Sequence, residues 1–152
     1  MTPYRHTQFS LLNILTIGFP AVICFIVFFA VNITGGFHYL TLGLGVLFLV
    51  LAFLFHALTI EVDADEIRMS FGPGLIRKTW PISTCTSARV IRTRLIDGWG
   101  IRMTKDGWLY NVSIPHAVLI RQTNGKAVQL GSDEPEALLA SLLEAGLELE
   151  ET

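Results

Sequence analysis

The chain has 152 residues, of which 51% are hydrophobic and 16% charged, and its formal net charge is −2. No Asp, Glu, Lys or Arg occurs between Thr7 and Ile60. The composition after Ile60 is ordinary for a globular domain. This division predicts a two-part protein, with a membrane part of about 60 residues and a soluble part of about 90 that can bury one modest core.

Charge is unevenly distributed within the second part. Residues 61–132 contain ten basic and six acidic side chains, a balance of +4, whereas residues 133–152 contain seven acidic side chains and no basic one. The two cysteines, Cys24 and Cys85, fall in different parts of the chain, so we expect no disulfide between them. Their spacing indicates no metal site, and we expect neither a metal nor a cofactor.

Two apolar runs, Phe9 to Val31 and Phe37 to Ile60, predict a transmembrane hairpin within residues 9–60. A helix of about 23 residues is about 34 Å long, which suffices for a hydrocarbon core of about 30 Å. The polar residues 32–36 include two glycines and suit a tight turn. A cleaved signal peptide has a shorter apolar run, and a buried soluble hairpin needs a polar face.

The distribution of Lys and Arg predicts the orientation of this hairpin. Arg5 lies in the N-terminal segment 1–8, and Arg68, Arg77 and Lys78 follow the second run, whereas the turn has no basic residue. By the positive-inside rule, both termini face the cytoplasm, and the protein is a multi-pass protein of the plasma membrane.

Residues 61–152 contain short alternating segments separated by turn signals, which predict β-strands. Thr104 to Gly107 ends in Asp-Gly and predicts a hairpin between 99–103 and 108–112. Asn124-Gly125 predicts a second hairpin, between 117–122 and 126–130.

A C-terminal helix is predicted over about 133–146. Asp133 and Glu136 have the spacing of a capping box, four leucines form an apolar stripe, and Gly146 is a natural stop. Residues from Glu148 onward are expected to be a frayed tail. We therefore expect a membrane α-helical hairpin followed by a mainly-β domain of about seven antiparallel strands and one helix, the plan of a pleckstrin-homology (PH)-like fold.

Several segments also resemble bacterial pleckstrin-homology-like membrane proteins with an N-terminal two-helix hairpin. They are Thr59 to Val62, Gly98 to Arg102, Gly107 to Ser113 and Val128 to Pro135, and the resemblance covers roughly residues 40–145. Ile114-Pro115-His116 departs from the pattern, because a glycine is usual there. The resemblance implies a PH-like fold at the bacterial inner membrane and implies no reaction.

Two groups of residues are candidates for contacts with a partner or with lipid. Trp99, Arg102, Trp108 and Tyr110, with Asn111 beside them, would form an aromatic platform with a cation alongside. The alternative is that these aromatic side chains pack in the core. Arg89, Arg92 and Arg94 form a basic stripe that would meet anionic lipid, and the alternative is a solvated face.

The sequence favours binding over catalysis. It has no phosphate-binding glycine loop, no metal-ligand cluster and no nucleophile with a recognisable local signature, so we do not expect an enzyme. Nucleic acid is a poor candidate, because no recognition motif is present. We expect a non-catalytic, membrane-anchored module that contacts a protein partner or anionic lipid headgroups. The alternative is a structural accessory subunit of a larger membrane complex.

Overall fold

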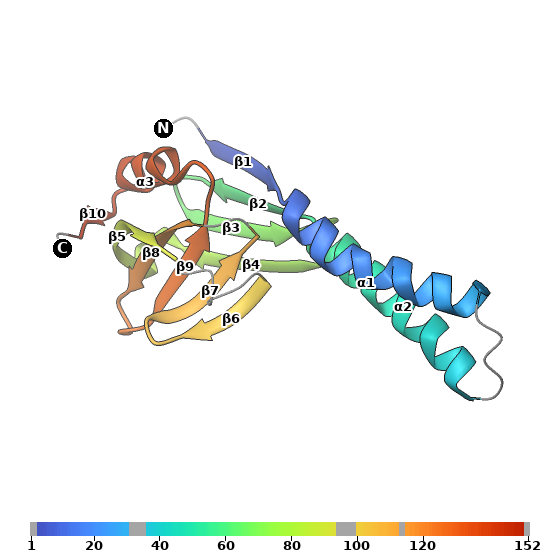
Figure 1. Ribbon diagram of the computed structural model, residues 1–152. Helices are drawn as coiled ribbons and strands as arrows, with labels where there is room; N and C mark the ends of the chain where they lie inside the picture. The colour runs from blue at the N-terminus through green and yellow to red at the C-terminus, as the bar shows by residue number, and fades with distance from the viewer. Residues whose placement is uncertain (1–2, 31–35, 94–99, 113–114, 151–152) are drawn as a thin grey trace.

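The computed structural model describes residues 3–30, 36–93, 100–112 and 115–150. A β-rich domain of two sheets lies at one end, and a hairpin of two long helices projects from it (Figure 1). Both chain termini lie at the domain end of the molecule, far from the tip of the hairpin (Figure 1).

The N-terminal segment belongs to the β domain. Strand β1 (Tyr4–Phe9) pairs antiparallel with β2 (Ala57–Val62), from Tyr4 opposite Val62 to Phe9 opposite Ala57. The sequence predicted residues 1–8 as a cytoplasmic N-terminal segment and indicated no strand there. Its alternation is too short and too polar to indicate a strand, and the strand forms because β2 offers a free edge.

Helices α1 (Leu11–Ala30) and α2 (Gly36–Leu54) connect these two strands. They are long and apolar enough to cross a membrane, and most of their side chains are exposed, unlike those of a core helix in a soluble protein. The second helix was predicted to continue to Ile60, but it ends at Leu54 and β2 begins at Ala57. The boundary is not visible in the sequence because residues 55–60 carry no charged side chain, and the first buried residues of β2, Ala57 and Leu58, are as apolar as the end of the helix.

The base of the hairpin is fixed by polar contacts. The Ser10 hydroxyl accepts a hydrogen bond from the Asn13 amide at 3.1 Å and caps α1. The Asn13 side chain, which is buried, donates to the Phe55 carbonyl at 3.2 Å. The backbone amide of Ser10 also donates to the His56 carbonyl at 3.0 Å. These bonds join the start of α1 to the end of α2.

The first sheet contains four antiparallel strands in the order β1-β2-β3-β4, with β3 at Glu66–Phe71 and β4 at Ile76–Pro81. Leu58, Ile60 and Val62 on β2 alternate with polar residues and point into the core, as do Ile67, Met69 and Phe71 on β3. The opposite face of this sheet is polar. This is the period-2 pattern of a sheet with one face on a core.

A short 3₁₀ helix, η1 (Ile82–Thr84), leads from β4 into the second sheet. That sheet has the order β10-β5-β8-β9-β7-β6. Its strands are β5 (Cys85–Arg92), β6 (Gly100–Thr104), β7 (Gly107–Asn111), β8 (His116–Gln122), β9 (Ala127–Gly131) and β10 (Glu148–Leu149).

The predicted hairpins β6–β7 and β8–β9 are both confirmed. Two pairings in the described residues are parallel, β7 with β9 and β10 with β5, and so the prediction of about seven antiparallel strands was wrong in number and in direction. Residues expected to fray after Glu148 instead form β10. Parallel pairing joins strands that are far apart in sequence, and local patterns carry no sign of it.

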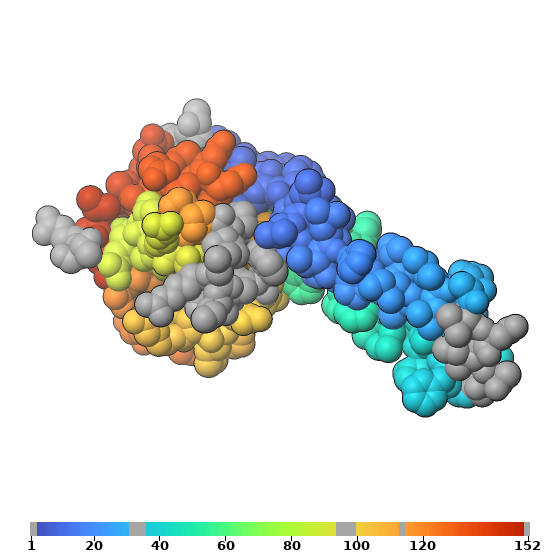
Figure 2. Space-filling model, in the orientation of Figure 1, coloured from blue at the N-terminus to red at the C-terminus, as the bar shows by residue number. Residues whose placement is uncertain are grey.

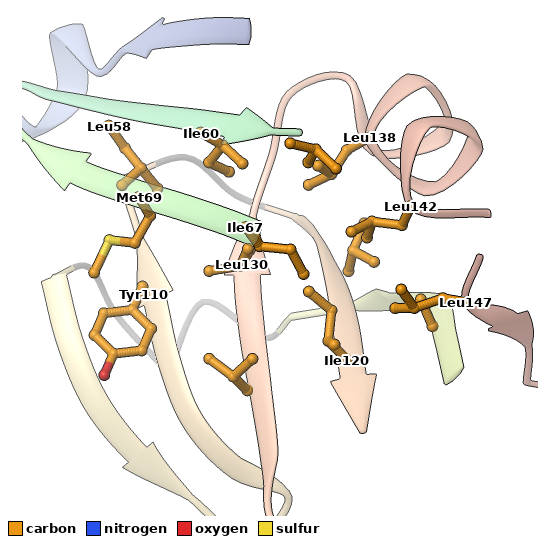
Figure 3. Packing of buried hydrophobic residues seen from close by; sticks show 14 of the residues in the cluster. Leu58, Ile60, Ile67, Met69, Tyr110, Ile120, Leu130, Leu138, Leu142 and Leu147 are labelled. Atoms are coloured by element: carbon orange, nitrogen blue, oxygen red, sulfur yellow. The ribbon is translucent and has the colours of Figure 1, made fainter. Parts of the chain in front are cut away.

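The core lies between the two sheets and beneath α3 (Pro135–Glu144), which covers one end (Figure 3). Leu138 and Leu142 of α3 are fully buried against strands of both sheets, and Leu147 follows from the chain after the helix (Figure 3). The helix is shorter than the predicted 133–146.

Each buried leucine of this helix contributes about 2 kcal/mol to the stability of the fold, at about 25 cal/mol per Å² of apolar surface buried.

The predicted capping box at the start of α3 does not form. The residue before the helix is Glu134, whose side chain makes no capping bond. Asp133 contacts His6 of β1 instead, with its Oδ1 atom 2.8 Å from the His6 Nε2 atom. The long-range contact takes the place of the local one, and it ties β1 to the entry of α3.

We expect Gly107→Ala to destabilise the protein by more than about 2 kcal/mol. Gly107 has a φ of +114°, and an added Cβ would lie 2.0 Å from the Ala127 carbonyl oxygen. Gly125→Ala is the matched control, because Gly125 has a φ of +77° and nothing within 4 Å of an added Cβ. It should cost about 1 kcal/mol. Denaturant unfolding in mild detergent, followed by tryptophan fluorescence, measures both, and equal losses would contradict the packing at Gly107.

We expect Gln8→Ala to cost about 1–3 kcal/mol of unfolding free energy. The buried Gln8 amide donates to the Gly131 carbonyl, and its Oε1 atom accepts from the Asp133 amide at 3.1 Å. Without the Gln8 side chain, the Gly131 carbonyl and the Asp133 amide lose this hydrogen-bond partner. Arg5→Ala on the exposed face of the same strand should cost less than about 1 kcal/mol. The same unfolding measurement compares the two variants. A smaller loss of unfolding free energy for Gln8→Ala than for Arg5→Ala would show that the Gln8 hydrogen bonds do not hold β1 in place.

Candidate functional site

Strand register places one row of side chains across the outer face of the six-stranded sheet. The row runs through Arg89 (β5), Leu119 (β8), Gln129 (β9), Leu109 (β7) and Arg102 (β6), each paired with the next. On β5 the alternate residues Ala88 and Val90 face the core. Alternation alone left open which residues of β5 face the core. The structure shows that Ala88 and Val90 do, and that Arg89 points away from it.

Arg89, Arg92 and Arg102 line one cavity of about 500 Å³ on this face. The other lining residues described are Ile91, Thr93, Met103, Thr104, Lys105, Asp106, Leu119 and Gln129. The cavity therefore gathers four cations and one carboxylate, and that carboxylate, on Asp106, lies 4.0 Å from the Lys105 Nζ atom. A site of this charge attracts anions, and guanidinium groups bind carboxylate and phosphate oxygens through paired hydrogen bonds.

Two buried polar atoms in the cavity wall make no hydrogen bond among the described residues. They are the Thr93 hydroxyl, on a side chain 6% exposed, and the Arg89 Nε atom. Buried donors are nearly always paired, and an unpaired donor costs about 1–3 kcal/mol. The Arg89 Nε atom forms an ion pair with the Glu150 carboxylate at 3.6 Å, so the Thr93 hydroxyl is the donor that remains for an acceptor in the cavity.

The floor of the cavity is held by a small hydrogen-bond network. The Gln129 amide donates to the Thr104 hydroxyl at 2.8 Å, and that hydroxyl donates to the Gly107 carbonyl at 2.8 Å. The backbone amide of Asp106 donates to the same hydroxyl at 3.3 Å. The β6–β7 turn that carries Lys105 is thereby fixed to β9. A binding site supported in this way is positioned before its ligand arrives.

The acidic C-terminal segment reaches one side of this site. Both carboxylate oxygens of Glu150 accept hydrogen bonds from the Arg121 Nε atom at 2.9 Å, and one lies 3.6 Å from the Arg89 Nε atom. The Glu150 amide also donates to the Ala88 carbonyl at 3.0 Å. Glu150 partly neutralises Arg89. Among the described residues no carboxylate forms an ion pair with Arg92 or Arg102, so these two remain the available cations.

The aromatic candidates lie elsewhere. On the β6–β7 hairpin, Trp108 is opposite Met103 and Tyr110 is opposite Ile101, whereas Arg102 is opposite Leu109. Arg102 therefore points to the other face of the hairpin from Trp108 and Tyr110. The predicted platform with Arg102 beside the two aromatic rings does not form, because residues adjacent along a strand alternate in direction.

Trp108 and Tyr110 line a second cavity of about 390 Å³ between β4 and the β6–β7 hairpin. The Tyr110 ring packs edge-on against Trp80 with centroids 5.7 Å apart, and burial raises the pKa of Tyr110. Tyr110 belongs to the core, as the alternative interpretation expected, while Trp108 is 45% exposed.

Arg94 and Trp99 lie outside the described residues, so the structure does not place them. Sequence reasoning missed Thr93 and Lys105, both of which line the cationic cavity. Thr93 could have been found, since alternation from Arg89 puts Ile91 and Thr93 on the same face of β5. Lys105 could not, because its nearness to β5 depends on the order of the three strands between β5 and β6.

The described ranges hold no group of three His, Cys, Asp or Glu residues that could bind a metal ion, and Cys24 and Cys85 are free thiols there. Burial raises the pKa of Cys85 and so keeps its thiol protonated. What the arrangement offers chemically is a fixed set of cationic donors for an anionic group.

Comparison with known proteins adds no assignment. No protein-family model matches the chain, and no curated protein shows significant similarity to it.

Proposed function

We propose that the chain is a non-catalytic binding module anchored in the plasma membrane, whose cationic cavity binds an anionic group of a protein partner. The helical hairpin crosses the bilayer, and the β domain lies in the cytoplasm. The observation that carries the proposal is the cavity, whose lining combines the four cations Arg89, Arg92, Arg102 and Lys105 with the buried Thr93 hydroxyl, which makes no hydrogen bond within the described residues.

The dimensions of the two helices support the membrane anchor. Twenty residues in α1 and nineteen in α2 correspond to lengths of about 30 and 28 Å, which match a hydrocarbon core of about 30 Å. Neither helix contains a charged residue, and apolar side chains cover their exposed surfaces. In water such a surface would cause aggregation.

The position of the basic residues supports a cytoplasmic domain. Strands β1 and β2 enter and leave the hairpin at the same end, so the whole β domain lies on one side of the bilayer (Figure 1). Arg5, Arg77 and Lys78 lie on that side. Basic residues next to a membrane span favour the cytoplasmic side.

The direction in which the cavity faces favours a protein partner over lipid. Figure 2 shows β5 (yellow-green) and β6 (yellow) on a side face of the domain. This face runs along the direction of the hairpin and is not the end from which the hairpin projects. Along β6, Gly100 is near Phe55 at the end of α2, and Lys105 follows β6 in the turn at its opposite end. Five residues of extended chain span about 17 Å, so the cavity extends away from the membrane surface. A carboxylate-bearing segment of a neighbouring protein can reach it from the side.

Photocrosslinking from Ile91 tests this proposal. Ile91 lines the cavity, is partly exposed and lies on the same face of β5 as Arg89, so benzoylphenylalanine at this position should react with whatever occupies the site. The full chain is expressed in cells, irradiated and purified in mild detergent, and the adducts are identified by mass spectrometry. We expect a protein adduct that falls at least tenfold when Arg92→Glu and Arg102→Glu are combined, since each lost charged hydrogen bond is worth about 1.5–3 kcal/mol.

Lys126→Glu is the matched control, because Lys126 is an exposed cation that lies outside the cationic cavity. It should leave the adduct unchanged. A lipid adduct with the same charge dependence would replace the protein partner by a lipid headgroup. An adduct whose yield is unchanged by both arginine substitutions would exclude the cavity as the binding site. If membrane subunits still co-purify in that case, the accessory-subunit alternative would be favoured.

A further inference from the structure

The turn between β3 and β4, residues 72–75, touches the end of the second long helix. The Gly72 amide donates to the Ala57 carbonyl at 2.9 Å. A Cβ atom at Gly72 would lie 2.6 Å from the Leu54 carbonyl oxygen and 2.8 Å from the Phe53 carbonyl oxygen. The backbone of the turn is therefore packed directly on the last carbonyl groups of α2.

This contact fixes the depth of the turn. Helix α2 has nineteen residues, and its length of about 28 Å matches the hydrocarbon thickness, so Leu54 lies at the edge of the hydrocarbon. The turn, a few ångströms from Leu54, lies at the same edge. Figure 1 shows the ends of β3 and β4 at the base of the hairpin, where the helices leave the domain.

The turn presents an apolar side chain at that depth. Leu75 is 77% exposed, which is unusual for a leucine in the β domain. Phe9 and Phe53, at the adjoining ends of β1 and α2, are also exposed. Apolar side chains that stand around the base of a transmembrane hairpin continue its lipid-facing surface.

Two cations follow within three residues of the turn. Arg77 and Lys78 are exposed, and no carboxylate of the described residues forms an ion pair with either. The Arg77 Nε atom donates to the Gly74 carbonyl, which holds the guanidinium beside the turn. By contrast, Arg68 on the same sheet is surrounded by Glu61, Asp63 and Glu66. Free cations at this depth are placed for lipid phosphates.

We propose that the β3–β4 turn is a third membrane contact, in which Leu75 enters the boundary between headgroups and acyl chains while Arg77 and Lys78 bind anionic lipid phosphates. The inference rests on the proposed membrane hairpin and is independent of the cationic cavity. This contact would keep the domain against the bilayer and fix the direction in which the cavity faces.

Spin labelling of the full chain tests the contact. Cys24→Ser and Cys85→Ser remove the native thiols, and Leu75→Cys, Val46→Cys and Thr123→Cys each provide one labelling site. Val46 lies within α2, and Thr123 lies in the β8–β9 turn beside Thr84. Each protein is reconstituted in nanodiscs of phosphatidylcholine with phosphatidylglycerol, and the accessibility of the label to oxygen and to a water-soluble nickel complex is measured.

We expect the label at 75 to have an oxygen-to-nickel accessibility ratio between those at 46 and 123. Arg77→Ala with Lys78→Ala should shift it toward the value at 123 in anionic nanodiscs and not in pure phosphatidylcholine. Each cation near an anionic leaflet favours the docked state about fivefold, equivalent to about 1 kcal/mol. Arg121→Ala with Lys126→Ala, which removes two positive charges beside the β8–β9 turn instead, should change nothing.

If the accessibility ratio at 75 equals that at 123, while the ratio at 46 shows a label buried in lipid, the third contact is overturned and the membrane hairpin stands. A label at 46 that reads as water-exposed would overturn both. A shift in pure phosphatidylcholine as large as that in anionic nanodiscs would exclude the binding of anionic phosphates by Arg77 and Lys78.

Discussion

Six paired residues of β1 and β2 hold the two ends of the helical hairpin side by side. The ladder from Tyr4–Val62 to Phe9–Ala57 joins the chain before α1 to the chain after α2, although 47 residues separate Phe9 from Ala57. The helices must therefore start and finish at neighbouring points of one sheet. Their antiparallel packing and the position of the domain at one end both follow from this pairing.

The same pairing completes the β domain. The inner face of β1 carries His6 and Gln8, which contact Asp133 and Gly131 at the junction between β9 and α3. The Tyr4 ring packs against the core, where burial first and the nearby Glu134 and Asp133 second raise its pKa to about 12. The hairpin is thus anchored to both sheets and to the C-terminal helix. Because these contacts are distributed along β1, the orientation of the domain relative to the helices is well determined.

Each sheet uses its two faces differently. Inward side chains build one apolar core, and the same alternation sends cations outward, from Arg89 and Arg102 on one sheet and from Arg77 on the other. Acidic partners neutralise some cations, as Glu150 does for Arg121 and Glu61 does for Arg5. Among the described cations without such a partner, Arg92 and Arg102 line the cavity and Arg77 and Lys78 follow the β3–β4 turn, which is why both places are proposed as contacts with anionic groups.

The sequence by itself determined whatever depends on neighbouring residues. Two charge-free runs predicted the helices, Asn124-Gly125 and Asp106-Gly107 predicted their hairpins, and a leucine stripe ending at Gly146 predicted α3. Only the tertiary structure decided the pairing of β1 with β2, the parallel pairings and the cavity that joins Arg89 to Arg102. Helical period and turn chemistry are local properties of the chain. The partner of a strand depends on the free sheet edge and the apolar face that the rest of the fold brings close to it. No short stretch of sequence contains that information.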